Sequence, residues 1–269
     1  MANVSDQNII SLGAPPEASD PIASLTIGLV DTSGAIAILV EALAELPPIP
    51  PSLFLDLEGA NLSRHGSLSI LQIHVSPAGQ TFLIDVHTLG NEAFTTPGTS
   101  GQTLKTILES TSIPKVFFDV RNDSDALFSH YGINLACIHD LQLMELASRN
   151  FGRKFVSGLA KCIDRDLPLT ARERKTCKET KEKGLNLFAP ERGGSYEVFN
   201  LRPLPEAVSL YCIQDVYFMP RLWKLYNSKL TATWKAKVLQ AGKDRVASSK
   251  TKMYVGHGQH KALAPAGWK

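Results

Sequence analysis

Two carboxylates, Asp56 and Glu58, stand two positions apart inside the apolar run SLFLDLE (52–58). In a strand, residues i and i+2 point to the same face, so both carboxylates would share one face. Neighbouring like charges on an interior strand repel each other and desolvate poorly without a cation. Hard oxygen ligands of this kind suit magnesium or manganese. The motif DxE is common, however, and the fraying end of a strand is the alternative interpretation.

A third carboxylate, Asp123, lies in the segment VRNDSDAL (120–127), where a predicted strand passes into a predicted helix. Turns at the carboxyl edge of a sheet often carry active-site residues. The alternative is a helix N-cap, for which Asn122, Asp123 and Ser124 all qualify. Asp125 is the nearest competitor for the functional role.

A fourth carboxylate, Asp215, follows Tyr211 by one helical turn in the segment YCIQD (211–215). On a helix, residues i and i+4 share a face, so the phenol and the carboxylate can converge on one point. The alternative is a core tyrosine followed by a surface aspartate.

The three motifs indicate more together than each does alone. They place four carboxylates and a phenol, in the order DxE, D, YxxxD, on a predicted strand, turn and helix. Two-metal phosphoryl chemistry needs such a set, because cations about 4 Å apart stabilise the attacking hydroxide and the leaving oxygen. Carboxylates would hold the cations and a polar group would orient the water.

The elements that must position these residues follow from the apolar periodicity. Expected strands cover 25–30, 52–58, 68–75, 81–86, 115–119 and 136–140. Expected helices cover 33–46, 102–110, 122–131, 141–149 and about 205–229, with a loop over 184–204 and helical patterns from 155 onward. The order is a β-meander, then alternating strands and helices, then helices, which predicts one α/β or α+β domain with a mixed sheet flanked by helices.

Charge is distributed unevenly along the 269 residues, whose net charge is +2. Residues 221–269 hold 11 Lys/Arg and one acid, whereas residues 1–220 hold 17 Lys/Arg and 25 acids. A basic end on an acidic body indicates contact with a polyanion, or else a solvated tail. The expected organisation is a flexible leader (1–20), one domain (21–240) and a basic, flexible tail (241–269).

The composition also argues against several classes of protein. No apolar run approaches the roughly 20 residues of a membrane helix. The N-terminus lacks the pattern of a secretory signal, and the first 50 residues contain six acids and no Lys or Arg, unlike a mitochondrial transit peptide. The four cysteines are widely spaced, which favours reduced thiols over a zinc or disulfide framework. We therefore expect an intracellular protein, cytoplasmic or nuclear.

Three segments carry a resemblance to a known family: LDLEGANLSRHGSLSILQIHV, KVFFDVRNDSDALFSHYGI and EAVSLYCIQDVYFMPRLW. They resemble the three motifs of the DEDDy branch of the DnaQ-like (RNase D type) 3′-5′ exonuclease superfamily, over about residues 50–230. The resemblance implies a ribonuclease H-like fold, with a mixed five- to six-stranded sheet flanked by helices. The tyrosine in YxxxD is what places the chain in this branch.

The resemblance also implies roles for the site residues. Asp56, Glu58 and Asp215 would bind the cation that activates water, Asp56 would also contact a second cation, and Asp123 would complete the cluster. Tyr211 would hydrogen-bond the nucleophile. The implied cofactors are two divalent cations, Mg²⁺ or Mn²⁺. The implied reaction releases nucleoside 5′-monophosphates from a free 3′ end of RNA or DNA, with RNA slightly preferred and a single strand or 3′ overhang as substrate.

The phrases RNDSDAL, ETKEKGLNLFAP and GGSYEVFNLRPL resemble the Egalitarian-like subgroup of exonuclease-domain proteins. Some members of that subgroup have lost catalytic residues and act as RNA-binding adaptors, which is the alternative function here. All five expected positions are filled in this chain, which favours activity. Phe118 departs from the family pattern, in which His often precedes the acidic residue. A third reading is an enzyme that trims very short oligonucleotides.

Six residues near the motifs are expected to contact nucleic acid. Leu57 lies between two of the carboxylates. Arg64 and His65 follow that strand in a loop, where they either contact the terminal nucleotide or a phosphate or are ordinary surface-loop residues. The charged stretch 171–183 is either a solvated helix or a helix that binds phosphates beside the site. Its lysines expected to reach the substrate are Lys178, Lys181 and Lys183.

Overall fold

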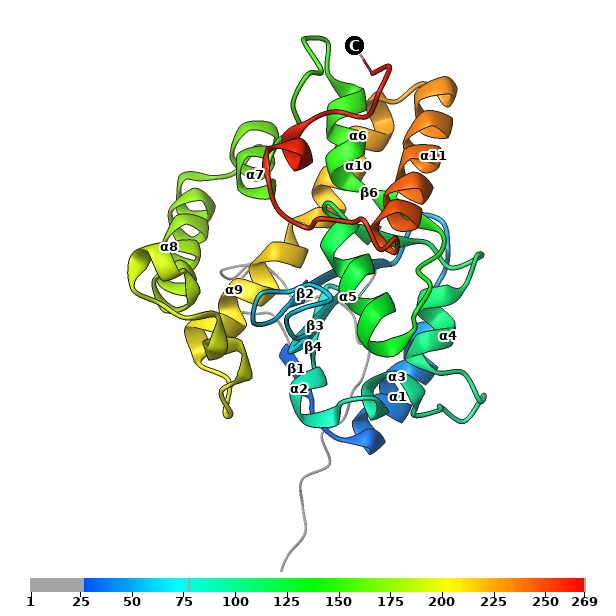
Figure 1. Cartoon of the computed structure of the whole chain (residues 1–269), viewed down its shortest axis with the longest axis vertical. Coiled ribbons are helices and arrows are strands. Elements are labelled where there is room, and N and C mark those ends of the chain that lie inside the picture. The colour runs from blue at the N-terminus through cyan, green and yellow to red at the C-terminus, as the bar shows by residue number, and fades with distance from the viewer. Residues whose placement is uncertain (1–26, 77, 269) are drawn as a thin grey trace, which may run out of the picture.

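A six-stranded mixed sheet forms the centre of the domain in the computed structural model, which describes residues 27–76 and 78–268 (Figure 1). The strands lie in the order β1-β4-β3-β2-β5-β6. β2, β3 and β4 form the expected antiparallel meander, while β1 pairs with β4, β5 with β2 and β6 with β5 in parallel. The strands are β1 Ile27–Val30, β2 Leu53–Glu58, β3 Ile70–Val75, β4 Gln80–Asp85, β5 Lys115–Phe117 and β6 Ile138–Asp140. The predicted mixed sheet is therefore confirmed.

One face of the sheet is closed by the helices of the first half of the chain. Leu53, Leu55 and Leu57 of β2 point into this layer, as their alternation predicts, and pack with apolar residues of α1, α3, α4 and α5. Phe54 points to the opposite face. The helices of this half are α1 Ser33–Ala44, α2 Val86–Leu89, α3 Glu92–Thr95, α4 Leu104–Glu109 and α5 Arg121–Tyr131.

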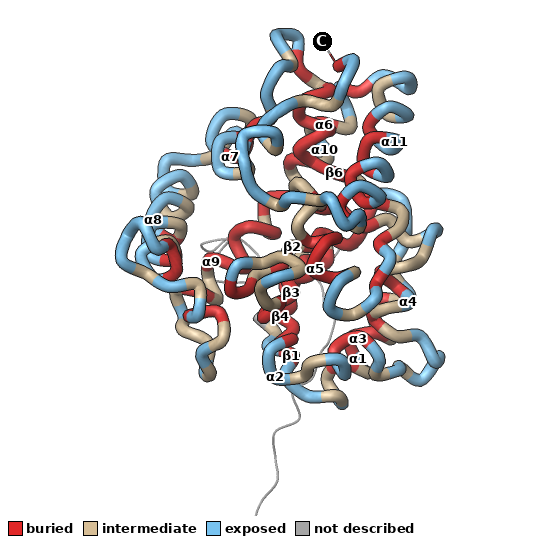
Figure 2. Tube along the Cα trace, viewed as in Figure 1, coloured by how far each residue is buried: buried red, intermediate tan, exposed pale blue. Residues whose placement is uncertain are grey.

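The opposite face is covered by helices of the second half. α9 packs against β2, β3 and β4, and α6 and α10 pack around Phe54. Figure 2 shows the buried residues concentrated on the sheet, α6 and α10. These helices are α6 Leu141–Ser148, α7 Leu159–Asp166, α8 Ala171–Phe188, α9 Glu206–Tyr217, α10 Met219–Lys229 and α11 Ala232–Ser249.

The long helix expected over 205–229 is two helices, α9 and α10, which meet at Phe218. Pro220 stands in the first turn of α10. A proline has no N–H to donate and its ring clashes with the carbonyl four residues earlier, so it interrupts a helix but is tolerated in a first turn. The position of Tyr211 and Asp215 on α9 is unaffected.

The loop expected over 184–204 begins later than predicted, because α8 continues to Phe188. Thr180, Gly184 and Phe188 are the buried residues of α8 and recur every four positions, so they form one stripe. This stripe packs against α9, so α8 continues past Gly184. Two 3₁₀ helices follow, Pro190–Arg192 and Tyr196–Asn200.

The basic C-terminal region is folded onto the domain, which corrects the expectation of a flexible tail over 241–269. α11 runs on to Ser249. Residues 250–268, here called the strap, return across the molecule (Figure 1). Val156 N donates to Ala262 O at 2.9 Å, and Trp268 is buried against Trp234. The sequence suggested disorder because the segment is polar, but two aromatic rings and backbone pairing attach it.

The expected leader, 1–20, lies outside the described residues. Among the helices that the structure describes, none combines the length and the apolar character that crossing a membrane requires.

Candidate active site

Three carboxylates from two elements converge above the centre of the sheet. Asp56, Glu58 and Asp215 each offer an oxygen, and these oxygens lie within 4.8 Å of one another. β2 brings the first two to one face, opposite the face that Leu55 and Leu57 bury. α9 crosses that face and supplies Asp215. The predicted convergence of the strand motif and the helix motif is therefore what the structure shows.

Asp123 joins the same pocket from the first turn of α5. It is not one of the three residues with mutually close oxygens, but it is 5% exposed and raises the pKa of Asp56 by its charge. Its competitor Asp125 accepts hydrogen bonds from Arg64 instead, at 2.7 Å from Nε and 2.9 Å from the backbone N–H. Asp125 therefore holds the loop after β2, and Asp123 faces the pocket.

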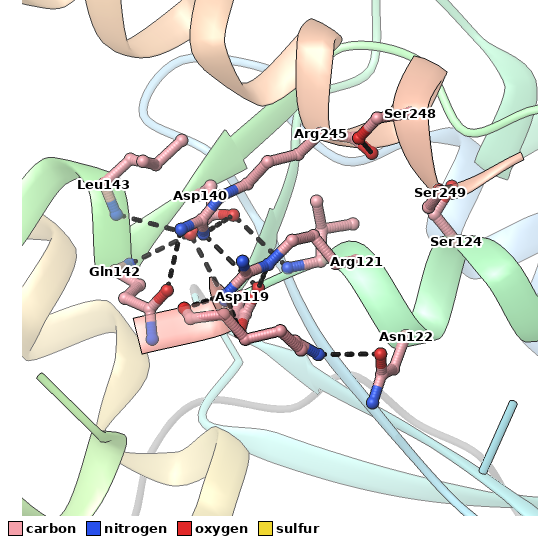
Figure 3. A network of polar contacts seen from close by, with 12 residues as sticks. Asp119, Arg121, Asn122, Ser124, Asp140, Gln142, Leu143, Arg245, Ser248 and Ser249 are labelled. Carbon is pink, nitrogen blue, oxygen red and sulfur yellow. Dashed lines mark hydrogen bonds and ion pairs between the residues drawn. The ribbon is translucent and has the colours of Figure 1, made fainter. Parts of the chain in front are cut away.

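A tight turn between β5 and α5 aims Asp123. Asp119 occupies the left-handed region, with φ at 65°, which aspartate tolerates better than most side chains. Figure 3 shows its carboxylate between the guanidinium groups of Arg121 and Arg245. Asp140, at the end of β6, accepts from the backbone N–H groups of residues 119 and 120 at 3.2 and 3.3 Å. This network fixes the start of α5 without using Asp123.

Tyr211 is positioned by the close approach of α8 and α9. A Cβ on Gly184 would lie 2.7 Å from the Tyr211 ring, so only glycine allows this contact. The ring also packs edge-on against Phe188, with centroids 4.9 Å apart. The phenol and the Asp215 carboxylate line the same pocket and interact, so the i, i+4 pair converges as predicted.

The carboxylates repel one another across the pocket that they line. Burial raises the pKa of Asp56 and Glu58 well above the usual range, and neighbouring carboxylates raise both further. Burial and the nearby Asp119 raise the pKa of Asp123 to about 7. Burial also raises the pKa of Asp215, although the Lys181 ammonium opposes this shift. The pKa of Tyr211 is raised by burial and by Asp215, so its hydroxyl remains a proton donor.

The six residues expected to contact nucleic acid take different positions. Lys181 reaches the cluster, with its Nζ 4.0 Å from Asp215 Oδ1. Leu57 is buried in the core and borders the carboxylate pocket. Arg64 and His65 line an adjoining pocket, although Arg64 also pairs with Asp125. Lys178 borders a pocket beside Asp215, and Lys183 is exposed on α8 away from the pockets described here.

Sequence reasoning missed four polar side chains that line the carboxylate pocket: Asp119, Asn122, Lys161 and Lys261. Asn122 was considered only as a helix cap. Lys161 and Lys261 come from α7 and from the strap, far from the motifs in the chain. Only the fold brings these lysines to the pocket, so no local pattern in the sequence would have identified them.

The carboxylate pocket suits divalent cations by its chemistry. Its donors are hard oxygens, which magnesium and manganese prefer. Besides burial, mutual repulsion raises the pKa values of these carboxylates, and the nearby Lys181 ammonium relieves that repulsion only in part. A divalent cation between the carboxylates would remove that repulsion.

A family model for 3′-5′ exonuclease domains matches residues 27–231, so the chain belongs to this family, which is of the DEDD type. Mouse piRNA biogenesis protein EXD1 is 28% identical over 169 residues, which are 61% of this chain and 27% of the mouse protein. The human protein of the same name is 38% identical over 89 residues, or 33% of this chain and 16% of that protein. The chain thus matches about a quarter or less of the length of these relatives.

Solved structures of RNase D share the fold. Trypanosoma brucei RNase D in complex with RNA U12 superposes with a TM-score of 0.70 at 21% identity, over 92% of this chain and 79% of that one. Escherichia coli RNase D gives a TM-score of 0.57 at 19% identity, over 84% and 51% of the two chains. The ribonuclease H-like architecture implied by the motifs is confirmed.

Proposed function

We propose that this protein is a metal-dependent 3′-5′ exonuclease that hydrolyses phosphodiester bonds at a free 3′ end. The observation that carries the proposal is the convergence of Asp56, Glu58 and Asp215, with oxygens within 4.8 Å of one another, in a pocket that Tyr211 also lines. Family membership over residues 27–231 supports the reaction class.

Each residue of the site has a separate role in this proposal. Asp56, Glu58, Asp123 and Asp215 would hold two divalent cations, Mg²⁺ or Mn²⁺, which supply charge stabilisation for the attacking and leaving oxygens. Tyr211, neutral and anchored against Gly184, orients the water for attack on phosphorus. Lys181 and Lys161 lie at the pocket wall, where an ammonium can bind a non-bridging phosphate oxygen.

RNA is the preferred substrate in this proposal. The structural relative with the TM-score of 0.70 holds RNA, and the curated relatives are named for piRNA biogenesis. Both facts describe those proteins, and they support a single-stranded RNA or a 3′ overhang as the first substrate to test here.

One observation favours a second candidate, an RNA-binding adaptor with slow or no turnover. The Lys181 ammonium is 4.0 Å from Asp215 Oδ1, where its charge competes with a cation for the same carboxylate. An adaptor would keep the pocket and bind RNA without needing metal.

A cleavage assay separates the two candidates. Single-stranded RNA and DNA labelled at the 5′ end are incubated with Mg²⁺, Mn²⁺ or EDTA, and products are resolved by length. We expect a ladder that shortens from the 3′ end and disappears in EDTA. Loss of a group that only hydrogen-bonds a metal ligand typically lowers activity roughly 10- to 100-fold. Asp215→Asn removes a proposed ligand itself, so it should reduce the cleavage rate by more than that factor. Tyr211→Phe should reduce it roughly 100-fold.

The matched control is Glu206→Gln, which removes an exposed carboxylate from the first turn of the same helix, α9. It should leave the rate unchanged. Tight RNA binding with no metal-dependent shortening would exclude the exonuclease and favour the adaptor. Cleavage restricted to oligomers of a few nucleotides would instead indicate a trimming enzyme for short products.

A further inference from the structure

The strap, residues 250–268, reaches the carboxylate pocket although it lies outside the segment 27–231 that the family model matches. Asn122 Oδ1 accepts hydrogen bonds from Tyr254 Oη and from Lys261 Nζ, both at 2.7 Å. Arg121 Nη2 donates to Lys261 O at 2.9 Å. At its far end, Ala264 N donates to Lys154 O at 3.1 Å. The strap therefore connects α5 to the segment before α7, beside the carboxylates.

The strap lines both the carboxylate pocket and a second pocket beside it, and the two pockets together are here called the groove. A second pocket of about 560 Å³ adjoins the carboxylate pocket of about 580 Å³. Glu58, Leu62 and Asn122 line both of them, so the two pockets share a border. The second pocket lies between the loop 61–65 and the strap residues 254–257.

The side chains along this groove combine cations with aromatic rings. Lys261 enters from the strap at the carboxylate end, and His257 lines the second pocket together with the rings of Tyr196 and Tyr254. The carboxylate of Asp125 in that pocket is already paired with Arg64, and its side chain is 2% exposed. Beyond Glu58, the groove thus offers the rings of Tyr196 and Tyr254 and the imidazole of His257, and its one further carboxylate is already paired with Arg64.

Lys261 is placed to bind an anion in this groove. An ammonium has three donors, and Asn122 accepts one of them. Its side chain lines the carboxylate pocket together with Asp119 and Asp123. Lys261 is therefore near the reacting end of the groove, with donors available for a phosphate oxygen.

Phosphates and flat bases alternate along single-stranded nucleic acid, which proteins grip with cations and aromatic side chains. We propose that the strap is a nucleic-acid-binding element in which Lys261 contacts a phosphate of the strand and Tyr254 stacks on a base beside the carboxylate site. This inference rests on the proposed function only for the location of the bond that is cleaved.

Equilibrium binding tests the inference in the full chain carrying Asp123→Asn. That change blocks turnover under the proposed function and removes any effect of Lys261 that acts through the Asp123 carboxylate. Short 5′-fluorescein-labelled single strands of RNA and of DNA are titrated by anisotropy between about 50 and 200 mM salt. The variants are Lys261→Gln, Lys261→Arg and Tyr254→Leu. Lys252→Gln, an exposed lysine of the same strap, is the matched control.

We expect Lys261→Gln to weaken binding and to reduce the slope of log Kd against log salt by about 0.7, the value for one phosphate contact on a single strand. Lys261→Arg should restore the slope. Tyr254→Leu should weaken binding about 5- to 100-fold with the slope unchanged, because stacking releases no counterions. Lys252→Gln should match the parent protein.

An unchanged slope in Lys261→Gln would overturn the inference, even if affinity fell, because that pattern indicates a structural role. Failure of the parent protein to bind either strand would overturn it as well. The proposed function fails separately. If RNA is shortened in a metal-dependent way but the salt slope of Lys261→Gln is unchanged, the strap does not bind substrate and the exonuclease proposal stands. If the salt slope of Lys261→Gln is reduced but the parent protein cleaves nothing, the strap binds nucleic acid and the exonuclease proposal is excluded.

Discussion

At the scale of single residues, Arg64 separates the roles of two neighbouring aspartates. Its side chain and its backbone N–H both bind the carboxylate of Asp125. Asp125 is thereby committed to holding the loop that follows β2, one wall of the groove. Asp123, two positions earlier and more than half a turn around α5, faces the other carboxylates. Arg64 therefore gives different roles to two aspartates that the sequence alone did not distinguish.

The raised pKa values of the cluster predict that metal binding depends on pH. Burial raises the pKa of Asp56, Glu58 and Asp215, and raises that of Asp123 to about 7. Because a cation binds the deprotonated form, the apparent affinity for Mn²⁺ should rise between about pH 6 and 8, with release of protons. Titration calorimetry in buffers of different ionisation enthalpy measures both quantities.

The same pKa shifts determine whether the stability of the metal-free protein rises or falls with pH. These carboxyls bind protons more tightly when folded, so metal-free stability should fall as pH rises from the ordinary carboxyl range through the raised values. Asp123→Asn should reduce the number of protons released. Affinity that stays constant across this pH range would contradict the cluster's electrostatics.

At the scale of elements, the contact between α8 and α9 places the tyrosine. Gly184→Ala would put a Cβ 2.7 to 2.9 Å from three atoms of Tyr211, so the ring must shift. Displacing a positioning group by a fraction of an ångström should lower the cleavage rate, here by roughly 10- to 100-fold. Single-turnover cleavage by the variant measures the effect.

Helix propensity by itself predicts that Gly184→Ala stabilises α8, so the two effects can be distinguished. Alanine favours a helix over glycine by up to about 1 kcal/mol. Gly34→Ala, in the first turn of α1 with no atom near the new Cβ, is the control and should stabilise the protein without changing the rate. If Gly184→Ala behaved like Gly34→Ala, the close approach would not position Tyr211.

At the scale of the whole molecule, α11 is tied to the sheet by a buried arginine. Arg245 is 7% exposed and donates to Asp140 at 2.7 Å and to Gln142 at 2.8 Å (Figure 3). It also pairs with Asp119, in the turn that aims Asp123. The C-terminal region therefore supports the candidate site from outside the segment that the family model matches.

Arg245→Ala should lower the free energy of unfolding by about 3–5 kcal/mol, because it leaves the buried Asp140 carboxylate without its cation. Urea unfolding followed by circular dichroism gives this value. Lys243→Ala removes an exposed positive charge from the same helix, and its effect should stay within about 0.5 kcal/mol. Equal effects of the two changes would mean that the network does not anchor α11.

The sequence by itself determined what depends on local periodicity. The two-residue repeat of SLFLDLE put Asp56 and Glu58 on one face of a strand, and the four-residue spacing put Tyr211 and Asp215 on one face of a helix. These are properties of one element, which neighbouring residues set. The mixed sheet followed from the order of such elements.

Tertiary structure decided what depends on contacts between distant segments. The ion pair between Arg64 and Asp125 left Asp123 as the carboxylate that faces the pocket. Contacts between helices extended α8 beyond Gly184, and long-range contacts ordered the polar, basic end as α11 and the strap. Lys261 stands 138 positions from Asp123 in the chain, yet its ammonium acts on that carboxylate. Such pairings come from long-range packing and buried ion pairs, whose strength depends on burial that no local pattern specifies.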